Sequence, residues 1–489
     1  MPAPRFLLHC LLLLSPATLF SQETEKAHPN IVLIFADDLG YGDLSCYGAT
    51  KIKTPNLDKL ATQGMKFTDA HSAASLCSPS RYGLLTGSSP WRLHKRGNGY
   101  RLPDDKPNIA SYLREYNYTS AAIGKWHLGY SKNWNKLPIT GPLERGFDYH
   151  FGVPSNHNDS TRAFIENHDL VGRKPNQEYK IIPEQDFPQG LATPRIEDQV
   201  DTTLTNKAIA FIERNAQNPF FLYFTPCAPH THVTPAAEFR GTSKAGLFGD
   251  YIQELDSHVG DILAKLDELK LAKNTLVIFT SDNGSTPKDF KGTNNVNLNL
   301  ADDSGEIREK FKSAKADAKK LGHITNGVWR DGKGYPYEGG HRIPFIARWP
   351  GKIPANTSSD HLLNLTDLFA TFADIIGTEL PTNGAEDSLS ILPALKGETK
   401  NTNDREAIFI QGDGKDIAIA VCSGQWKLIV RNEKEKSSYE LYDLKSDAGE
   451  NNNLSEQHPE ITNRLAQALI QAEKSGRTRP EQLSETLTH

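Results

Sequence analysis

The sequence predicts an α/β fold in which a large, mostly parallel (mixed) sheet is sandwiched by helices and a smaller subdomain follows. Short apolar runs typical of buried strands alternate with amphipathic segments of helical spacing along most of the chain. Such alternation indicates parallel pairing with helices on both faces of the sheet. After about Gly397, short strands with tight connections and one helix predict a C-terminal antiparallel sheet plus helix subdomain, residues 398–489.

Each expected element is an apolar run or an amphipathic segment. The expected strands of the large sheet are Ile31 to Ala36, Ser120 to Ile123, Phe220 to Phe224, Thr275 to Thr280 and Ile343 to Ala347. The first expected helix begins at Pro55, after the cap Thr54, and stops at Gly64. Three further helices are expected over Leu204 to Ile212, Leu255 to Leu269 and His361 to Ile376. The polar stretch Asn294 to Lys320 predicts an inserted loop with a helix from about Ser304 to Leu321. The C-terminal subdomain is expected to contain the strands Ile417 to Val421, Trp426 to Val430 and Tyr439 to Leu444 and the helix Ile461 to Ala472.

Composition limits the classes of partner. The chain has 489 residues, of which 37% are hydrophobic, enough to build a sizeable core. Lys and Arg number 55 against 60 Asp and Glu, so the formal charge is −5 and no basic surplus points to nucleic acid. An anionic substrate would therefore need a local cluster of cationic side chains.

The N-terminus has the pattern of a secretory signal peptide. Arg5 precedes the apolar run Phe6 to Leu14, and small residues such as Ala17 follow. We therefore expect a signal peptide over residues 1–21, a main domain over 22–397, and an exported protein, periplasmic or secreted; the alternative is a buried N-terminal helix. No later segment is apolar enough to predict a membrane span.

Few cysteines remain after residue 21. Cys46, Cys77, Cys227 and Cys422 are too sparse for a dense disulfide framework and allow one or two bridges at most. A cysteine with a chemical role is the more informative interpretation.

Oxygen-bearing side chains follow two of the predicted strands. Asp37 and Asp38 come after the first strand, and Asp282 and Asn283 come after Thr275 to Thr280. In an open parallel sheet, ligands bind beyond the carboxyl ends of the strands. Several hard oxygens at one edge suit Ca²⁺ or Mg²⁺, whereas either pair alone is explained as turn or cap residues.

Basic side chains follow two further strands. Lys125 and His127 come after Ser120 to Ile123 and point to the same side if the extended conformation persists. His230 and His232 come after Phe220 to Phe224. Each histidine alone is explained as structural, but their shared edge indicates a site.

The segment Cys77-Ser78-Pro79-Ser80-Arg81 predicts the start of a helix. Pro79 suits the first turn and Ser78 suits the cap, so Cys77 is expected at a helix N-terminus, where the helix field favours anions and lowers the pKa of a thiol. The spacing alone leaves open whether Cys77 is a reactive thiol or a buried structural cysteine.

Cys77-x-Pro79-Ser80-Arg81 followed by Leu85-Thr86-Gly87 resembles the signature of the type I sulfatases, within the alkaline phosphatase-like superfamily. Further segments resemble that family: Asn30 to Gly42, Thr54 to Phe67, Gly124 to Gly129, Pro229-His230, Asp282 to Gly284, Gly332 to Gly340 and Glu440 to Leu454. The resemblance implies that a formylglycine-generating or sulfatase-maturing enzyme oxidises Cys77 to formylglycine, and that the product hydrolyses sulfate monoesters.

The resemblance also implies roles for single residues. Asp37, Asp38, Asp282 and Asn283 are expected to hold a cation, Ca²⁺ with Mg²⁺ as the alternative, together with modified Cys77. Arg81 is expected to hold the aldehyde hydrate, Lys125 and Lys333 to bind sulfate oxygens, and His127 and His230 to transfer protons. A further polar contact is expected after Gly152-Val153-Pro154, from Asn156 or His157.

The chemistry explains why the modification is needed. One hydroxyl of the hydrate is expected to attack sulfur, and the ester oxygen takes a proton from His230 as its bond to sulfur breaks, so that it leaves as an alcohol. The second hydroxyl then loses its proton to His127, sulfate is expelled and the aldehyde re-forms. A serine or cysteine has no second hydroxyl and would remain sulfated.

Two alternatives compete with this interpretation. One is a formylglycine-dependent hydrolase of phosphonate monoesters or phosphodiesters, and the other is an unmodified, non-catalytic exported binding protein with the same fold. A sulfated carbohydrate is the expected substrate by resemblance, and specificity is expected to lie in loops such as Val153 to Arg173 and Asn294 to Lys320.

Overall fold

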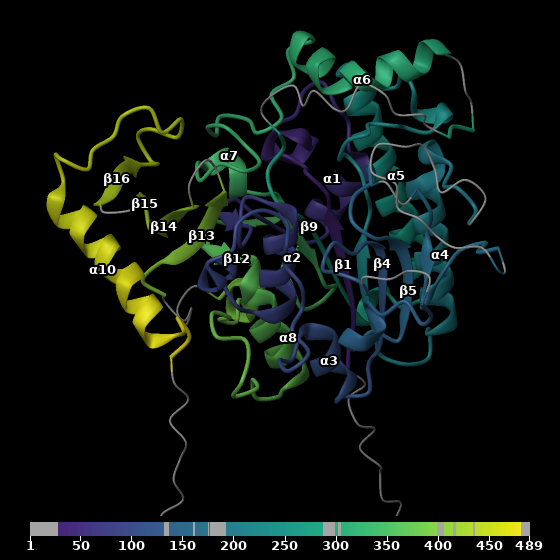
Figure 1. The fold of residues 1–489 in the computed structure, drawn as a ribbon, viewed down its shortest axis with the longest axis horizontal. Helices are drawn as coiled ribbons and strands as arrows, with labels where there is room; N and C mark the ends of the chain where they lie inside the picture. The colour runs from purple at the N-terminus through teal and green to yellow at the C-terminus, as the bar shows by residue number, and fades with distance from the viewer. Residues whose placement is uncertain are drawn as a thin grey trace, which may run out of the picture.

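The structure is a computed structural model that describes residues 28–131, 136–159, 162–174, 176, 192–286, 299–301, 305–398, 405–413, 417–433 and 436–480. In this part of the chain, a ten-stranded sheet carries helices on both faces, and a separate four-stranded antiparallel sheet packs with a C-terminal helix (Figure 1). The predicted fold class is confirmed. The predicted signal peptide lies outside the described residues, and the boundary at residue 397 stays a prediction.

The large sheet has a parallel centre and antiparallel additions. Its strands lie in the spatial order β11 (Thr357–Ser359), β2 (Met65–Phe67), β10 (Phe345–Arg348), β9 (Thr275–Ser281), β1 (Asn30–Ala36), β8 (Phe220–Thr225), β4 (Thr119–Lys125), β5 (Tyr149–Val153), β6 (Ile165–Glu166) and β7 (Asp169–Leu170). The five strands from β9 to β5 are mutually parallel, and β10 runs antiparallel to β9. The carboxyl ends of β9, β1, β8 and β4 therefore lie side by side at one edge of the sheet.

Alternating side chains of the central strand feed two hydrophobic cores. Ile31, Leu33 and Phe35 of β1 pack on one face with residues of α2, α3 and α8. Val32 and Ile34 pack on the other face with residues of α1, α4, α5 and α6. A strand buried on both faces has to be apolar throughout, as the run Ile31 to Ala36 is. The helices are α1 (Pro55–Thr62), α2 (Cys77–Thr86), α3 (Ile109–Arg114), α4 (Val200–Arg214), α5 (Gly246–Glu268), α6 (Gly305–Lys320), α7 (Glu338–His341), α8 (Leu368–Ile376), α9 (Leu392–Leu395) and α10 (Pro459–Ser475).

The C-terminal sheet contains one strand more than predicted. Its strands are β13 (Ile408–Asp413), β14 (Ile417–Ser423), β15 (Trp426–Glu433) and β16 (Lys436–Asp443), each antiparallel to the next. Leu465 and Leu469 of α10 pack against Val421 and Leu428 of this sheet. The additional strand is β13, which pairs with β14 along its length.

The predicted helix from His361 to Ile376 is wrong over its first residues. Leu363 and Asn364 form a short strand, β12, that pairs with β3 (Ala70–His71), and the α-helix begins only at Leu368. Asn364 accepts a hydrogen bond from the Thr366 N–H at 3.1 Å, and its own N–H donates to Asp367 at 2.8 Å. This reciprocal capping makes Asn364 the N-cap, so the helical turns begin after it. Hydrophobic spacing does not indicate such a boundary.

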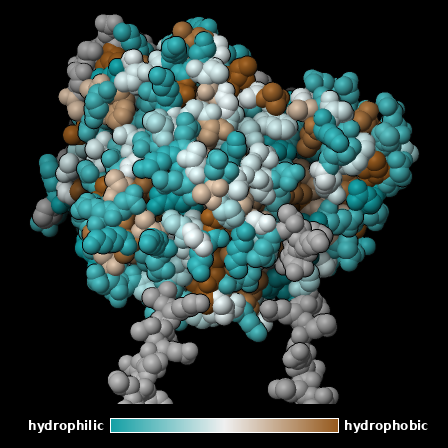
Figure 2. Space-filling model, turned by 180° about the vertical axis from the view of Figure 1, so that it is seen from behind, coloured by the Kyte–Doolittle hydropathy of each residue, from teal (hydrophilic) through white to brown (hydrophobic). Residues whose placement is uncertain are grey.

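The described residues include no helix that is both long and apolar enough to cross a bilayer. On the face shown in Figure 2, hydrophilic side chains predominate and hydrophobic ones occur in small separate groups.

A buried ionic network joins the C-terminal sheet to the large sheet's loops. Lys427 of β15 places its amine 3.0 Å from Glu338 of α7, 2.8 Å from Glu450 and 2.9 Å from His341 Nε2. All four side chains are buried. Glu338 and His341, with His71, also form a group whose spacing suits a metal ion. The Lys427 amine already contacts Glu338 and His341 of that group, so it supplies the positive charge that a metal ion would otherwise bring there.

Replacing Lys427 by methionine is expected to lower the free energy of unfolding by about 3–5 kcal/mol, because Glu338 and Glu450 would remain buried without their cation. Chemical unfolding of the purified chain measures this change. Lys445→Met, at an exposed position just after β16, is the matched control and should change stability little. A Lys427→Met protein as stable as the control would show that the network does not stabilise the fold.

Candidate active site at the carboxyl edge of the sheet

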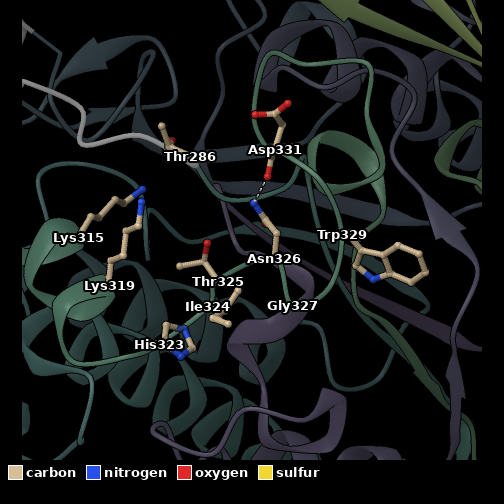
Figure 3. A pocket seen from close by; sticks show the side chains of 10 residues that line it. All are labelled: Thr286, Lys315, Lys319, His323, Ile324, Thr325, Asn326, Gly327, Trp329 and Asp331. Carbon is tan, nitrogen blue, oxygen red and sulfur yellow. Dashed lines mark hydrogen bonds between the residues drawn. The ribbon is translucent and has the colours of Figure 1, made fainter. Parts of the chain in front are cut away.

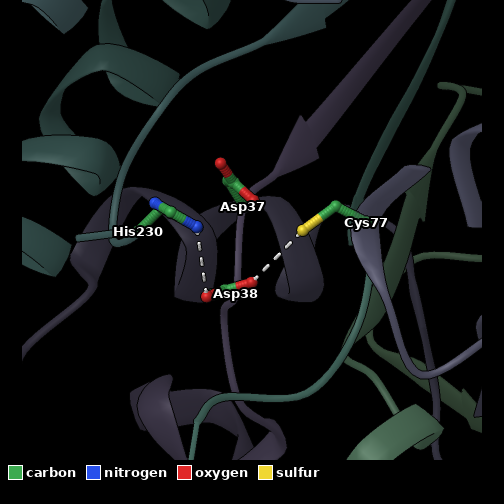
Figure 4. Close-up of side chains that lie close together, drawn as sticks. All are labelled: Asp37, Asp38, Cys77 and His230. Atoms are coloured by element: carbon green, nitrogen blue, oxygen red, sulfur yellow. Dashed lines mark hydrogen bonds and ion pairs between the residues drawn. The ribbon is translucent and has the colours of Figure 1, made fainter. Parts of the chain in front are cut away.

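The predicted oxygen ligands meet where β1 and β9 end. The Asp38 N–H donates to an Asp282 carboxylate oxygen at 3.1 Å, and Asn283 Nδ2 donates to Asp38 at 2.9 Å. Asp37, Asp38, Asp282 and Asn283 are all buried. Figure 4 shows Asp37 and Asp38 beside Cys77 and His230, four residues whose ligand atoms lie within 4.8 Å of one another. β1 and β9 are adjacent and parallel, which brings the two pairs together.

The donor set fits a hard cation. Three carboxylates and one amide supply oxygens, which are the ligands that Ca²⁺ and Mg²⁺ prefer. Asn283 Oδ1 is buried and accepts no hydrogen bond from the described residues, although its Nδ2 is bonded. A buried amide oxygen left without a donor is costly, and a cation would satisfy it.

Cys77 is the first residue of α2, and its thiol lies 3.7 Å from Asp38 Oδ1. The predicted cap is two positions off, because Leu76 is the N-cap and the Ser78 side chain does not cap the helix. Ser78 N–H donates to Asn98 instead, at 3.3 Å. Arg81 lies one turn after Cys77 on the same side of α2, and its guanidinium donates to Asp282 at 3.0 and 2.7 Å. The helix therefore presents the cysteine and the arginine to the same carboxylates.

The expected lowering of the thiol pKa is wrong. Burial raises the pKa of Cys77 to about 12, although Lys125 and Lys333 act in the opposite direction. The helix field is too weak to offset complete removal from water and two nearby carboxylates. Without a bound cation, the unmodified side chain is thus a neutral thiol and a poor nucleophile.

Two lysines from distant segments reach the carboxylates. Lys125, the last residue of β4, places its amine 2.7 Å from Asp37. Lys333 places its amine 2.7 Å from Asp38. Its loop is fixed by main-chain hydrogen bonds: the Lys333 N–H donates to Ser285 at 3.1 Å and the Gly334 N–H to Ser75 at 2.7 Å. Burial tends to raise the pKa of Asp38, but Lys333 and the other cations hold it well below its ordinary value.

Three histidines lie in or near this edge. His230 Nε2 is 3.8 Å from Asp38, while Nδ1 lies 2.5 Å from the Thr231 carbonyl and is therefore the protonated nitrogen. Burial holds the pKa of His230 well below its ordinary value, against the pull of Asp38. His127 is also held neutral by burial and by Lys125, which lower its pKa, and its Nδ1 has no hydrogen bond from the described residues. His232 packs against the His157 ring, with 6.5 Å between centroids.

The structure separates the two candidates for the further polar contact. The His157 ring is fully buried, accepts or donates a hydrogen bond with Thr234 at 2.8 Å, and faces Glu197 at 3.4 Å. Asn156 is partly exposed, and its Oδ1 has no hydrogen bond from the described residues.

Two side chains that the sequence does not predict also lie near Asp38. Thr286 places its hydroxyl 3.5 Å from Asp38, and Lys315 of α6 places its amine 4.0 Å from the same carboxylate. Lys315 lies on the helix predicted within the inserted loop. Lys315 follows a long polar stretch of the sequence. Nothing in that stretch indicates that the helix packs close to the ends of the strands.

Comparison with known proteins identifies relatives along most of the chain. A family model described as Sulfatase matches residues 29–378, and one described as N-sulphoglucosamine sulphohydrolase, C-terminal, matches residues 327–475. An N-acetylgalactosamine-6-O-sulfatase of Bacteroides thetaiotaomicron is 35% identical, with 92% of this chain and 93% of that protein covered. The human N-acetylgalactosamine-6-sulfatase is 34% identical, with 82% of this chain and 71% of that protein covered.

The fold has a solved counterpart as well. A structure from work on glycosaminoglycan metabolism by Bacteroides thetaiotaomicron, designated a 6S sulfatase, superposes with a TM-score of 0.79 and 33% identity. The match covers 91% of this chain and 99% of that one.

Proposed function

The chain belongs to the sulfatase family and hydrolyses sulfate esters, and from that premise we propose that its substrate is a glycan bearing 6-sulfated N-acetylgalactosamine. The proposal is supported by the relatives that share about a third of its residues over most of its length. The observation that most directly supports sulfate-ester hydrolysis is that Lys125, Lys333 and Arg81 all contact the carboxylates beside Cys77.

We propose that Asp37, Asp38, Asp282, Asn283 and modified Cys77 hold Ca²⁺, with Mg²⁺ as the alternative ion. A bound divalent cation would polarise the sulfate group and favour ionisation of a hydroxyl on the modified Cys77. Asn283 Oδ1, buried without a hydrogen bond from the described residues, supports its place in this ligand set. Arg81, itself fully buried, balances the Asp282 charge and orients that carboxylate.

We assign roles to the remaining side chains from their positions around the carboxylates beside Cys77. Lys125 and Lys333 stabilise negative charge on the sulfate oxygens as it develops. His230 turns Nε2 toward Asp38 and is the donor to the leaving alcohol. Because Nδ1 already carries a proton, this role requires the ring to take up a second one, which the arriving anion favours by raising the His230 pKa. His127 is the base that accepts the proton of the second hydroxyl.

Asn156 is the better candidate for the further substrate contact. Its side-chain oxygen is free of hydrogen bonds from the described residues, whereas His157 is engaged by Thr234 and Glu197. We assign His157 the role of fixing the loop that carries Asn156.

We further propose that the protein is exported, to the periplasm or the medium, and that a formylglycine-generating or sulfatase-maturing enzyme is its partner. The pattern of Arg5 followed by Phe6 to Leu14 supports the first point, and the Cys77-x-Pro79-Ser80-Arg81 motif supports the second.

A panel of substrates tests the proposal. Turnover of 6-sulfated N-acetylgalactosamine is expected to exceed that of the 4-sulfated isomer and of 6-sulfated N-acetylglucosamine by about tenfold or more in kcat/KM, because the pocket must distinguish single hydroxyl positions. An aryl sulfate and an aryl phosphonate complete the panel. Preference for another sulfated sugar would refute the substrate, and preference for the phosphonate would favour the phosphonate hydrolase alternative.

A further inference from the structure

Lys315 is a buried cation that the proposed mechanism leaves without a role. Its Nζ is enclosed by protein and makes no hydrogen bond to the described residues; the nearest opposite charge recorded is Asp38, 4.0 Å away. The amine also lies 5.4 Å from the centroid of the Phe248 ring. A buried amine without a hydrogen-bond acceptor is unfavourable, so this position favours binding of an anion.

The carboxylates near Lys315 are already engaged by other cations. Asp38 contacts Lys333 at 2.7 Å and faces His230 at 3.8 Å, while Asp37 pairs with Lys125 and Asp282 with Arg81. Three carboxylates therefore face four basic side chains, those of Arg81, Lys125, Lys315 and Lys333, before any divalent cation is added. Among these four described cations, Lys315 lies farthest from a carboxylate, 4.0 Å from Asp38, and its amine makes no hydrogen bond to the described residues.

A pocket opens on that side. It has a volume of about 170 Å³ and is lined by residues that include Thr286, Lys315, Lys319, His323, Trp329 and Asp331. Lys319 lies one helical turn after Lys315, and Figure 3 shows the two amines next to each other at one wall. Thr286 joins the pocket to the active site, because its hydroxyl lies 3.5 Å from Asp38.

The other ionisable lining groups have partners of their own. His323 Nε2 is hydrogen-bonded to Asp43 at 2.7 Å, and Asp331 faces the guanidinium of Arg330 at 3.5 Å. Among the described basic residues that line this pocket, Lys315 and Lys319 are thus the two whose side chains make no hydrogen bond, and both remain available to a ligand.

We propose that Lys315 and Lys319 form an accessory anion subsite that binds a second acidic group of the glycan, a carboxylate or a second sulfate, beside the sulfate that is cleaved. This inference rests on the proposed glycan substrate and narrows it to chains with at least two acidic groups close together. Lys315 lies nearer the reacting sulfate, and Lys319 supplies the outer charge of the subsite.

The test compares Lys319→Ala with the wild type on three sugars: N-acetylgalactosamine 6-sulfate, N-acetylgalactosamine 4,6-disulfate, and a disaccharide of a uronic acid and 6-sulfated N-acetylgalactosamine. The variant is expected to raise KM about tenfold for a doubly acidic sugar and to leave the monosulfated sugar within about twofold, since a hydrogen bond to a charged group has an effect of this size. The disulfate and the uronate distinguish which acidic group the subsite takes. Lys320→Ala is the matched control, because the Lys320 amine is exposed and pairs with Asp317 at 3.1 Å.

Equal effects of Lys319→Ala on all three sugars, or none on any, would overturn the subsite. The affinity of the same sugars for the Cys77→Ser form, measured by calorimetry with and without Lys319→Ala, gives a readout that does not depend on turnover. If the wild type hydrolysed none of the sugars, the proposed substrate would fail, while a loss of affinity confined to doubly acidic sugars would still support the subsite.

Discussion

Cys77→Ser is expected to reduce steady turnover at least about a thousandfold, the largest effect of any substitution considered. Serine differs from cysteine by one atom and fits the same place at the start of α2. It is, however, not a substrate for a maturing enzyme that accepts only cysteine. Its single hydroxyl is able to accept the sulfuryl group from an ester, but it has no second hydroxyl whose deprotonation would expel sulfate and re-form an aldehyde.

Two measurements separate this loss from a loss of fold. Thermal unfolding of the Cys77→Ser protein should match the wild type, and sulfated sugars should still bind, because Lys125 and Lys333 remain in place. Cys46→Ser is the control for replacing a cysteine whose charged neighbours are Asp58 and Lys66 and not the carboxylates beside Cys77, and it should retain full turnover. Sustained turnover by the Cys77→Ser protein would exclude the aldehyde mechanism.

Removing the divalent cation is expected to lower kcat by about a hundredfold or more, and added Ca²⁺ should restore it. The physical reason is the charge balance around Asp38. In the proposed mechanism, the cation and the lysines together stabilise the transferring group, whereas the lysines alone are already paired with Asp37 and Asp38. Activity and bound metal, measured together after exhaustive chelation and after addition of Ca²⁺ or Mg²⁺, test this expectation and identify the ion.

Asp38→Ala tests the same expectation from the protein side. This variant should hold less than one cation per chain and should not be rescued at the Ca²⁺ concentration that restores the chelated wild type. Asp261→Asn removes an exposed carboxylate of α5 and serves as the control for a change of charge. A metal-free wild type with unchanged kcat would refute the catalytic role of the cation.

The positions of the predicted metal ligands follow from the parallel strand pairing, which the sequence predicts correctly. Apolar runs such as Ile31 to Ala36 mark strands buried on both faces, and parallel pairing puts the residues after them at one edge. Asp37, Asp38, Asp282 and Asn283 therefore meet as the pattern predicts. The resemblance to sulfatases added the roles of Lys333 and Arg81, which lie in a loop and a helix that periodicity alone does not bring to the sheet.

Other features depend on tertiary contacts and were not predictable. The thiol pKa is decided by complete burial and by neighbouring carboxylates, which are invisible in the sequence around Cys77. The start of α8 is decided by the reciprocal hydrogen bonds of Asn364 and Asp367. Lys315 reaches Asp38 because α6 packs beside α5. The polar sequence of this helix does not indicate that contact.

The most direct test of the central claim is the mass of the peptide that contains Cys77, measured in preparations of graded activity. The mechanism predicts an aldehyde at residue 77 in active protein, and kcat for the 6-sulfated sugar should rise in proportion to the modified fraction. Protein expressed without a maturing enzyme should carry the intact thiol, bind substrate and not turn over. A fully active preparation that contains only unmodified cysteine at position 77 would contradict the mechanism.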